Sequence, residues 1–203
     1  NAVRTLGGRG PAVISAGVAS QRERMLSGAP YRADDPDLVA GRKACQRLLE
    51  AFNATQADDG DRRRQLLGDL LATFGEGSEI LPRFQCDYGT YIRIGRECFV
   101  NYDAVLLDCA PITVGDHVAI GPRVQLLTAL HPVDDHQARR DGWESAAPVT
   151  IGDNVWLGAG VIVCPGVTIG DNSVIGAGSV VIRDVPATVL AAGNPCRVIR
   201  HLR

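Results

Sequence analysis

The chain has 203 residues, which fits one domain or a domain with a short appendage. Its 21 Lys and Arg residues nearly balance its 23 Asp and Glu residues and leave a net charge of −2. This balance excludes a basic nucleic-acid platform or an acidic tail as the main function. No apolar run approaches the ~20 residues that a membrane-spanning helix needs. The 23 glycines and few aromatic residues instead indicate repetitive β structure with tight corners.

Residues 1–24 show no sustained hydrophobic periodicity, and we expect a disordered leader there. The six cysteines are scattered along the chain without a Cys-x-x-Cys pair. A chain of this length needs no disulfide to stabilise its core, so reduced thiols and a cytoplasmic location are expected.

Residues 25–80 are predicted to form a cap of two amphipathic helices. Asp35-Pro36 is typical of an N-cap followed by proline in the first helical turn. After a polar break at 58–61, the second helix is expected to run to Gly75. Each helix carries an apolar stripe that must be buried against another part of the chain. The stripe of the first helix consists of Leu38, Leu48, Leu49 and Phe52.

A six-residue repeat dominates residues 81–186, and it is clearest from Ile151 in the hexads IGDNVW, LGAGVI, VCPGVT, IGDNSV, IGAGSV and VIRDVP. The first position is aliphatic, the second is mostly Gly and the fifth is Val or Ser, so we expect the first and fifth to point inward and Gly to relieve a bend. An ordinary parallel α/β sheet would need crossover segments of about a dozen residues, and these are absent. The pattern predicts a parallel β-helix with three hexads per triangular coil, closed by residues 187–203.

The repeat is interrupted between about residues 127 and 148, and an insertion into a solenoid must loop outward. The loop opens with Thr128-Ala129-Leu130-His131-Pro132. An unperturbed imidazole titrates near pH 6.5 and can therefore take a proton from a hydroxyl at neutral pH. Pro132 restricts the backbone of His131 and helps to orient its ring. His131 is thus the candidate general base, and a solvated surface histidine is the alternative.

The hexads, the Thr-Ala-x-His-Pro segment and the closing segment 193–200 together resemble the hexapeptide-repeat maltose and galactoside O-acetyltransferases and their nodulation-type relatives. The resemblance runs from Tyr31 to Arg200, about four fifths of the chain. It implies a left-handed parallel β-helix and a homotrimer in which the histidine loop of one subunit faces its neighbour. It also implies acetyl-CoA as donor, no required metal, and a sugar hydroxyl that His131 deprotonates for direct attack on the thioester.

The resemblance assigns sugar binding to five polar residues, namely Asp35, Asp87, Asn101, Asp108 and Glu144. Structural roles are the alternatives: a helix N-cap for Asp35, a corner cap for Asp87 and a left-handed corner for Asn101. Asp108 would bind the sugar or orient His131. Cys109 stands where some relatives have a second Asp, which leaves the acceptor open.

The resemblance places the donor along the C-terminal coils, against Ala159, Ala177, Ile182, Arg183, Arg197 and Arg200. Ala159 and Ala177 lie in Gly-Ala-Gly triplets, whose thin wall would let a pantetheine arm run along the backbone. Arg183 matches a position that is usually basic and faces the cofactor. Arg197 and Arg200 would pair with phosphates, and solvated surface arginines are the alternative.

The sequence alone leaves three other functions open. A zinc enzyme of the gamma carbonic anhydrase type would use His131 and His136 with either His117 or His201 as third ligand. A non-catalytic solenoid would bind partners through its flat faces but leaves the interruption unexplained. An antibiotic O-acetyltransferase would share the repeats and the loop histidine, although the helical cap and the Cys-Asp-Tyr-Gly segment favour a sugar acceptor.

Overall fold

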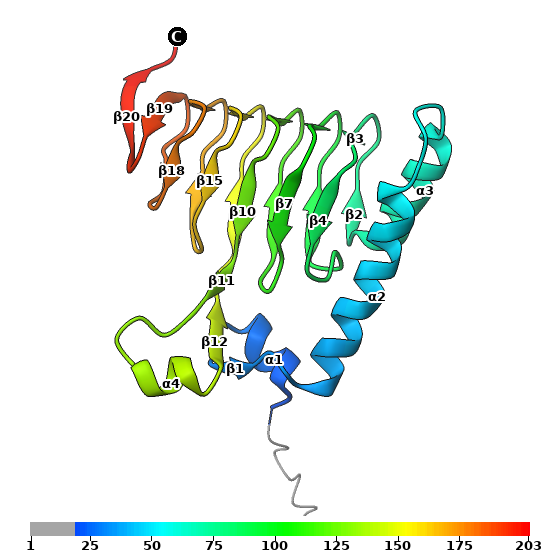
Figure 1. Ribbon diagram of the computed structural model, residues 1–203. Coiled ribbons are helices and arrows are strands. Elements are labelled where there is room, and N and C mark those ends of the chain that lie inside the picture. The colour runs from blue at the N-terminus through cyan, green and yellow to red at the C-terminus, as the bar shows by residue number, and fades with distance from the viewer. Residues whose placement is uncertain (1–18) are drawn as a thin grey trace, which may run out of the picture.

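The computed structural model describes residues 19–203, so most of the expected leader lies outside the described residues. The chain forms a three-sided parallel β-helix with a helical cap at one end and an arm that leaves one corner (Figure 1). This architecture confirms the fold class that the hexads predict. Among the described residues, no helix is both long and apolar enough to cross a membrane.

The chain visits the three sheets in the fixed order I, II, III, and strands within each sheet are paired in parallel from coil to coil. Sheet I contains β2 (Thr73–Phe74), β5 (Ile92–Ile94), β8 (Ile112–Val114), β13 (Val149–Ile151) and β16 (Thr168–Ile169). Sheet II contains β3 (Glu79–Ile80), β6 (Phe99–Val100), β9 (Ala119–Ile120), β14 (Trp156–Leu157), β17 (Val174–Ile175), β19 (Val189–Gly193) and the antiparallel β20 (Cys196–His201). Sheet III contains β4 (Phe84–Cys86), β7 (Ala104–Leu107), β10 (Gln125–Leu127), β15 (Ile162–Val163) and β18 (Val180–Val181).

The first and fifth positions of the hexads fill the prism, as the repeat predicts. From Ile151 to Val185, no side chain at these positions is more than 7% exposed. The two serines among them keep hydrogen-bond partners, which makes their burial tolerable. Ser173, for example, donates to the Pro186 carbonyl oxygen at 2.8 Å.

The second-position glycines are needed for a different reason from the expected one. Gly152 and Gly158 do not adopt positive φ angles; those fall on fourth-position residues such as Asn154, with φ of 53°. A Cβ on Gly158 would lie 2.6 Å from the backbone nitrogen of Ala177 in the next coil. These glycines therefore allow successive corners to stack closely, rather than relieving a bend.

Replacing Gly158 with alanine is expected to destabilise the β-helix by roughly 1–3 kcal/mol, because the added methyl group meets backbone that has no room to move. Gly68 provides the matched control, since it lies within a helix and a Cβ there meets nothing within 4 Å. The Gly68→Ala change should raise the free energy of unfolding by up to about 1 kcal/mol through helix propensity. Urea unfolding of both variants checks the contrast, and equal effects would contradict it.

The cap contains three helices, α1 (Gln21–Leu26), α2 (Pro36–Asn53) and α3 (Gly60–Leu70). Asp35 caps α2 as predicted, because its side chain accepts from the Asp37 backbone N–H. Leu49 and Phe52 of α2 join the apolar stripe of α3 and the first coils in one buried cluster, whereas Leu38 packs in a separate one. The second helix ends at Leu70 rather than at Gly75, since Thr73 and Phe74 already pair with β5. The β-helix therefore begins at residue 73 instead of 81, and β19 extends it beyond residue 186.

The expectation of a disordered segment up to residue 24 was wrong for its last residues. Helix α1 starts at Gln21, and a capping box formed by Ser20 and Glu23 fixes its first turn. Met25 is fully buried in a second apolar cluster, which joins α1 to the arm. The capping-box pattern was present in the sequence and was overlooked.

The interruption of the repeat forms the arm, as expected for an outward loop (Figure 1). It consists of β11 (Ala129–Leu130), α4 (His136–Arg140) and β12 (Trp143–Ala146). Strand β12 pairs antiparallel with β11 on one side and with β1 (Tyr31–Arg32) on the other. The arm is thus a small sheet tied to the cap, and it holds His131 at a defined place outside the prism.

Candidate active site

Two of the five acceptor candidates, Asp87 and Glu144, belong to one polar cluster at the corner between sheets III and I. The cluster combines them with Tyr31 of β1 and with Cys109, which lies one coil after Asp87. Tyr31 donates its hydroxyl to Glu144 Oε2 at 2.8 Å, and the Cys109 thiol donates to Asp87 Oδ2 at 3.4 Å. We call these four residues the acceptor cluster. It rests on the second apolar cluster, to which both Tyr31 and Cys109 also belong.

Burial governs the protonation of the acceptor cluster. It raises the pKa of the Cys109 thiol to about 12, and the carboxylate of Asp87 adds to the effect. It also raises the pKa of Tyr31 far above the usual value, with a further contribution from Cys109. Both groups therefore keep their protons and act as hydrogen-bond donors. A thiol held in this state is a poor nucleophile, which argues against an acetyl-cysteine intermediate on Cys109.

Asp87 itself is half-buried at the surface end of the cluster. Its burial raises the pKa of the carboxyl group, whereas the Cys109 hydrogen bond and the charge of Arg42 lower it. Arg42, on α2, also donates to the Tyr88 hydroxyl at 2.7 Å and to the Ala33 carbonyl oxygen at 2.6 Å. Sequence reasoning missed Arg42, because one arginine on the polar side of a helix gives no signal by itself.

Asp108 does not reach the surface, which corrects the expectation that it contacts the sugar or His131. Its side chain is fully buried and accepts backbone N–H groups from Asp87 at 3.0 Å, Tyr88 at 2.8 Å and Tyr91 at 3.2 Å. These bonds hold the turn that presents Asp87. Asp108 therefore supports the backbone beneath the acceptor cluster.

Burial raises the pKa of Asp108 to about 6, despite the three hydrogen bonds that favour its charged form. The folded protein therefore binds this proton more tightly than the unfolded chain does. The contribution of Asp108 to stability is full below the unfolded pKa of about 3.9 and is lost as pH rises through about 6. The Asp108→Asn variant lacks this titrating group and serves as the reference. We expect the free energy of unfolding of the wild type, relative to that of Asp108→Asn, to be about 1 kcal/mol higher at pH 5 than at pH 7. Urea unfolding at both values checks this, and a difference independent of pH would contradict it.

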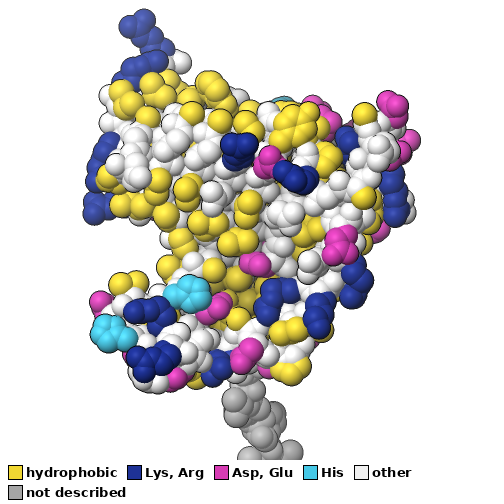
Figure 2. Space-filling view, in the orientation of Figure 1, with side chains coloured by type: hydrophobic (Ala, Val, Ile, Leu, Met, Phe, Trp, Pro, Cys, Tyr) yellow, Lys and Arg dark blue, Asp and Glu magenta, His cyan; other side chains and the backbone are white. Residues whose placement is uncertain are grey.

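His131 follows β11 directly and is exposed. Its imidazole makes no hydrogen bond to another described residue. The next residue, Pro132, lines a cavity of about 480 Å³ between the arm and the α1–β1 segment, together with Trp143 and Glu144. The arm also overhangs a hollow beside sheet III, and most histidine side chains visible in Figure 2 lie on the arm. In a single chain, the side chain of His131, the candidate base, is therefore open to solvent.

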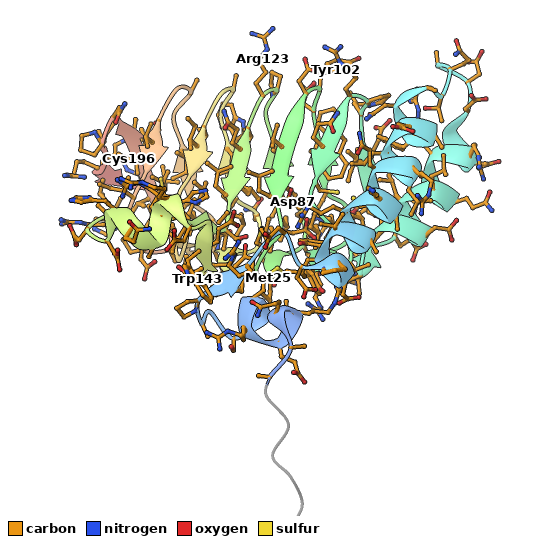
Figure 3. The ribbon with its side chains drawn as sticks, turned by 60° about the horizontal axis from the view of Figure 1, so that its bottom comes forward. Met25, Asp87, Tyr102, Arg123, Trp143 and Cys196 are labelled. Carbon is orange, nitrogen blue, oxygen red and sulfur yellow. The ribbon has the colours of Figure 1, made fainter. Side chains whose placement is uncertain are left out.

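A second group of candidates lies at the opposite edge of sheet III, at the corner between sheets II and III. Strand register places Asn101, one position after Val100, in line with Gly158 and Gly176 of later coils, and Ala159 and Ala177 directly follow these glycines. A shallow cavity of about 460 Å³ is lined there by Tyr102, Arg123 and Ala159. Figure 3 shows Tyr102 and Arg123 at one edge of the β-helix and Asp87 at the other. One chain therefore does not bring Asn101 close to the acceptor cluster.

Asn101 is half-buried, and its side-chain oxygen accepts from the Tyr102 backbone N–H at 2.7 Å. The left-handed conformation at this corner belongs to Asp103, with φ of 60°, and not to Asn101. The alternative role as a left-handed corner is therefore wrong for this residue. Asp35, in contrast, has the structural role already described as the N-cap of α2.

The basic donor candidates are all exposed. Arg183 and its neighbour Ile182 follow β18, whereas Arg197 and Arg200 lie on β20. Arg197 donates to the Cys196 carbonyl oxygen at 2.8 Å. Within the described residues, none of these arginines forms a salt bridge, so their charges are available to an anionic ligand.

Two family models match the chain. The maltose acetyltransferase hexapeptide capping motif matches residues 24–75, and six repeats of the bacterial transferase hexapeptide match residues 148–183. The two matches coincide with the helical cap and with the most regular coils. Together they define the class of the protein as a hexapeptide-repeat transferase with a capping motif.

Individual relatives show which family of hexapeptide-repeat transferases the chain resembles. The chain is 50% identical to nodulation protein L of Rhizobium leguminosarum bv. viciae, over 88% of this chain and 94% of that one. It is 41% identical to the galactoside O-acetyltransferase of Escherichia coli, over 89% and 88% of the two chains. The crystal structure of a maltose O-acetyltransferase from Clostridium difficile superposes with a TM-score of 0.90 at 46% identity, covering 92% of this chain and all of that one. A galactoside acetyltransferase in complex with coenzyme A gives 0.88 at 40% identity, covering 92% of each.

The chain belongs to the maltose and galactoside O-acetyltransferase family of hexapeptide-repeat enzymes. The family places it among acetyltransferases, and not among the zinc-dependent carbonic anhydrases or non-catalytic scaffolds that the sequence left open.

Proposed function

We propose that this enzyme transfers the acetyl group of acetyl-CoA to a hydroxyl of a sugar, with His131 as general base. The observation that carries the proposal is the position of the His131-Pro132 segment. The arm holds it at the rim of a cavity whose wall includes Glu144 of the acceptor cluster. Carboxylates such as Asp87 and Glu144 accept hydrogen bonds from sugar hydroxyls, and Asn101 can both donate and accept them.

The reaction needs no covalent intermediate on the protein. The neutral imidazole of His131 takes the proton of the sugar hydroxyl as its oxygen attacks the thioester carbonyl carbon. The tetrahedral oxyanion then collapses, the carbon–sulfur bond breaks, and the leaving thiolate takes the proton back from the imidazolium. The raised pKa of the Cys109 thiol supports direct transfer over an acetyl-cysteine route.

The donor is proposed to lie along the corner between sheets II and III. Ala159 and Ala177 are exposed there and give a thin wall against which a pantetheine arm can approach the backbone. Ile182 and Arg183 follow β18 at the other edge of sheet III, so they would face a cofactor held at the donor corner of a neighbouring subunit. Arg197 and Arg200, exposed on β20, would meet its phosphates.

Replacing both Arg197 and Arg200 with alanine is expected to raise KM for acetyl-CoA roughly ten- to a hundredfold, because two charge-assisted contacts to phosphate are lost. The value of kcat at saturating donor should stay near that of the wild type. Arg93→Ala, on the outer face of sheet I, is the control and should change neither constant. Steady-state kinetics decides the matter, and an unchanged KM for acetyl-CoA would remove these arginines from the donor site.

A homotrimer would complete the site, because the acceptor cluster and the donor corner lie at different edges of one chain. The outer surfaces of the sheets support such packing. Facing outward in register on sheet II are Phe99, Ala119, Trp156, Val174 and Leu190, with Trp156 56% exposed. Sheet I instead presents Thr113, Thr150 and Thr168 at the corresponding positions. Apolar outer faces favour burial between subunits, and a neighbour seated in the hollow beside the arm would bring its donor corner to His131.

The proposed acceptor class is tested with a panel of galactosides, maltose, glucose, amino sugars and a hydroxyl-bearing antibiotic. Release of free CoA thiol from acetyl-CoA is followed, and the acetylated product is located by mass spectrometry. We expect acetyl esters on sugar hydroxyls. Transfer to the antibiotic in preference to every sugar would reassign the enzyme, and thiol release without any acetylated acceptor would contradict the proposal.

A further inference from the structure

Two thiols from distant parts of the chain meet where the cap joins the β-helix. Cys45 lies on α2 and Cys86 ends β4, 41 residues later. Their sulfur atoms are 3.5 Å apart, and the Cys45 thiol also lies 3.7 Å from the carbonyl oxygen of Cys86. All six cysteines are described, and no other two of them have sulfur atoms in hydrogen-bond contact. The proposed acetyl transfer uses neither thiol.

Small molecules can reach this pair from two sides. Cys86 is half-buried and lines a cavity of about 330 Å³ together with Arg42, Lys43 and Asp87. Cys45 is buried but borders a second cavity of about 290 Å³ beside Leu70. Each cavity is large enough to hold hydrogen peroxide, which is hardly larger than water.

We propose that Cys45 and Cys86 form a thiol-oxidation site, at which hydrogen peroxide closes a disulfide that staples the cap to the β-helix. Peroxide first oxidises the Cys86 sulfur to a sulfenic acid, and the first water leaves. The Cys45 sulfur then attacks the sulfenic sulfur, so that the sulfur–sulfur bond forms, the sulfur–oxygen bond breaks and the second water leaves. The two thiols supply two electrons and two protons, which reduce one peroxide to two waters.

The sulfur atoms need to approach by only about 1.5 Å to reach the ~2.05 Å of a disulfide. The nearby Cys45 thiol and burial raise the pKa of Cys86, so the thiolate is scarce and the oxidation should accelerate as pH rises. Because Asp87 follows Cys86 directly, the staple would fix one wall of the acceptor cluster to α2. The inference concerns the covalent bond itself and stands whether or not the proposed acetyl transfer is correct.

The test treats the reduced 203-residue chain with a few equivalents of hydrogen peroxide, without substrates. Peptide mapping under non-reducing conditions should find one peptide that links Cys45 to Cys86, and the number of free thiols should fall from six to four. Closing a loop of this length should raise Tm by several degrees. Dithiothreitol should reverse both effects. The inference is overturned if Cys45 and Cys86 stay reduced, are oxidised without joining, or pair with other cysteines.

Two variants sharpen the result. Cys86→Ser should lose both the link and the gain in Tm. Cys164→Ser is the matched control, because Cys164 is also half-buried but contacts no other cysteine, and this variant should keep both effects. Equal loss in the two variants would overturn the inference. If Cys86→Ser does not fold, the wild-type peptide map together with the control decides alone.

Discussion

Replacing His131 with alanine is expected to lower kcat for acetyl transfer by about 10²–10⁴-fold, which is the usual contribution of a general base. KM for acetyl-CoA should change little, because the proposed donor contacts lie on other elements. The side chain is exposed and makes no hydrogen bond to another described residue, so the variant should fold with unchanged stability. Thiol-release kinetics and thermal unfolding of the same preparation measure the two effects separately.

His136 provides a control on the same arm. It begins α4, five residues after His131, and is also exposed. His136→Ala should keep kcat within about twofold of the wild type, because a surface residue away from the reacting atoms affects neither packing nor chemistry. If His131→Ala retains most of its activity, or if both variants lose it equally, the proposed base is wrong.

Mixing two impaired variants is expected to restore activity, because the proposed site takes His131 from one chain and Asn101 from its neighbour. Asn101→Ala should lower kcat/KM at least tenfold through the lost hydrogen bonds to substrate. In equimolar random trimers of His131→Ala and Asn101→Ala chains, about a quarter of the sites combine both intact residues. Activity should therefore rise to about a quarter of the wild-type value after co-refolding.

A chain that carries both substitutions is the control for mixing. Combined with either single variant, it offers no site with both residues intact, and no activity should return. Analytical ultracentrifugation establishes that the mixed chains assemble. Mixed trimers that stay inactive would show that each chain builds its own site. An Asn101→Ala variant that keeps its activity on its own would show that Asn101 has no part in it.

The sequence predicted the parallel β-helix well because the six-residue repeat turns the same two positions of every hexad inward. Each first-position residue from Ile151 onward must enter the prism for neighbouring coils to pair, so local pattern and global fold agree. The boundaries were less accurate. Thr73 and Phe74 lie before the visible hexads yet pair with β5, and only the docking of α3 shows that the first coil starts there.

The candidate site was predicted in part. Asp87 and Glu144 do meet in one cluster, although 57 positions separate them in the chain. The burial of Asp108 was not foreseen, because a Leu-Asp pair looks the same whether the carboxylate faces solvent or three backbone N–H groups. Contacts between the cap and the coils, such as that of Arg42 with Tyr88, depend on how α2 docks and leave no periodic trace in the sequence.

The most direct test is a crystal structure of the enzyme with coenzyme A and a sugar acceptor bound. We expect coenzyme A along Ala159 and Ala177 of one subunit, with its sulfur directed toward the arm of the next. An imidazole nitrogen of His131 should lie roughly 2.6–3.2 Å from a sugar hydroxyl. A ring that faces solvent while both ligands occupy the enzyme elsewhere would contradict the account.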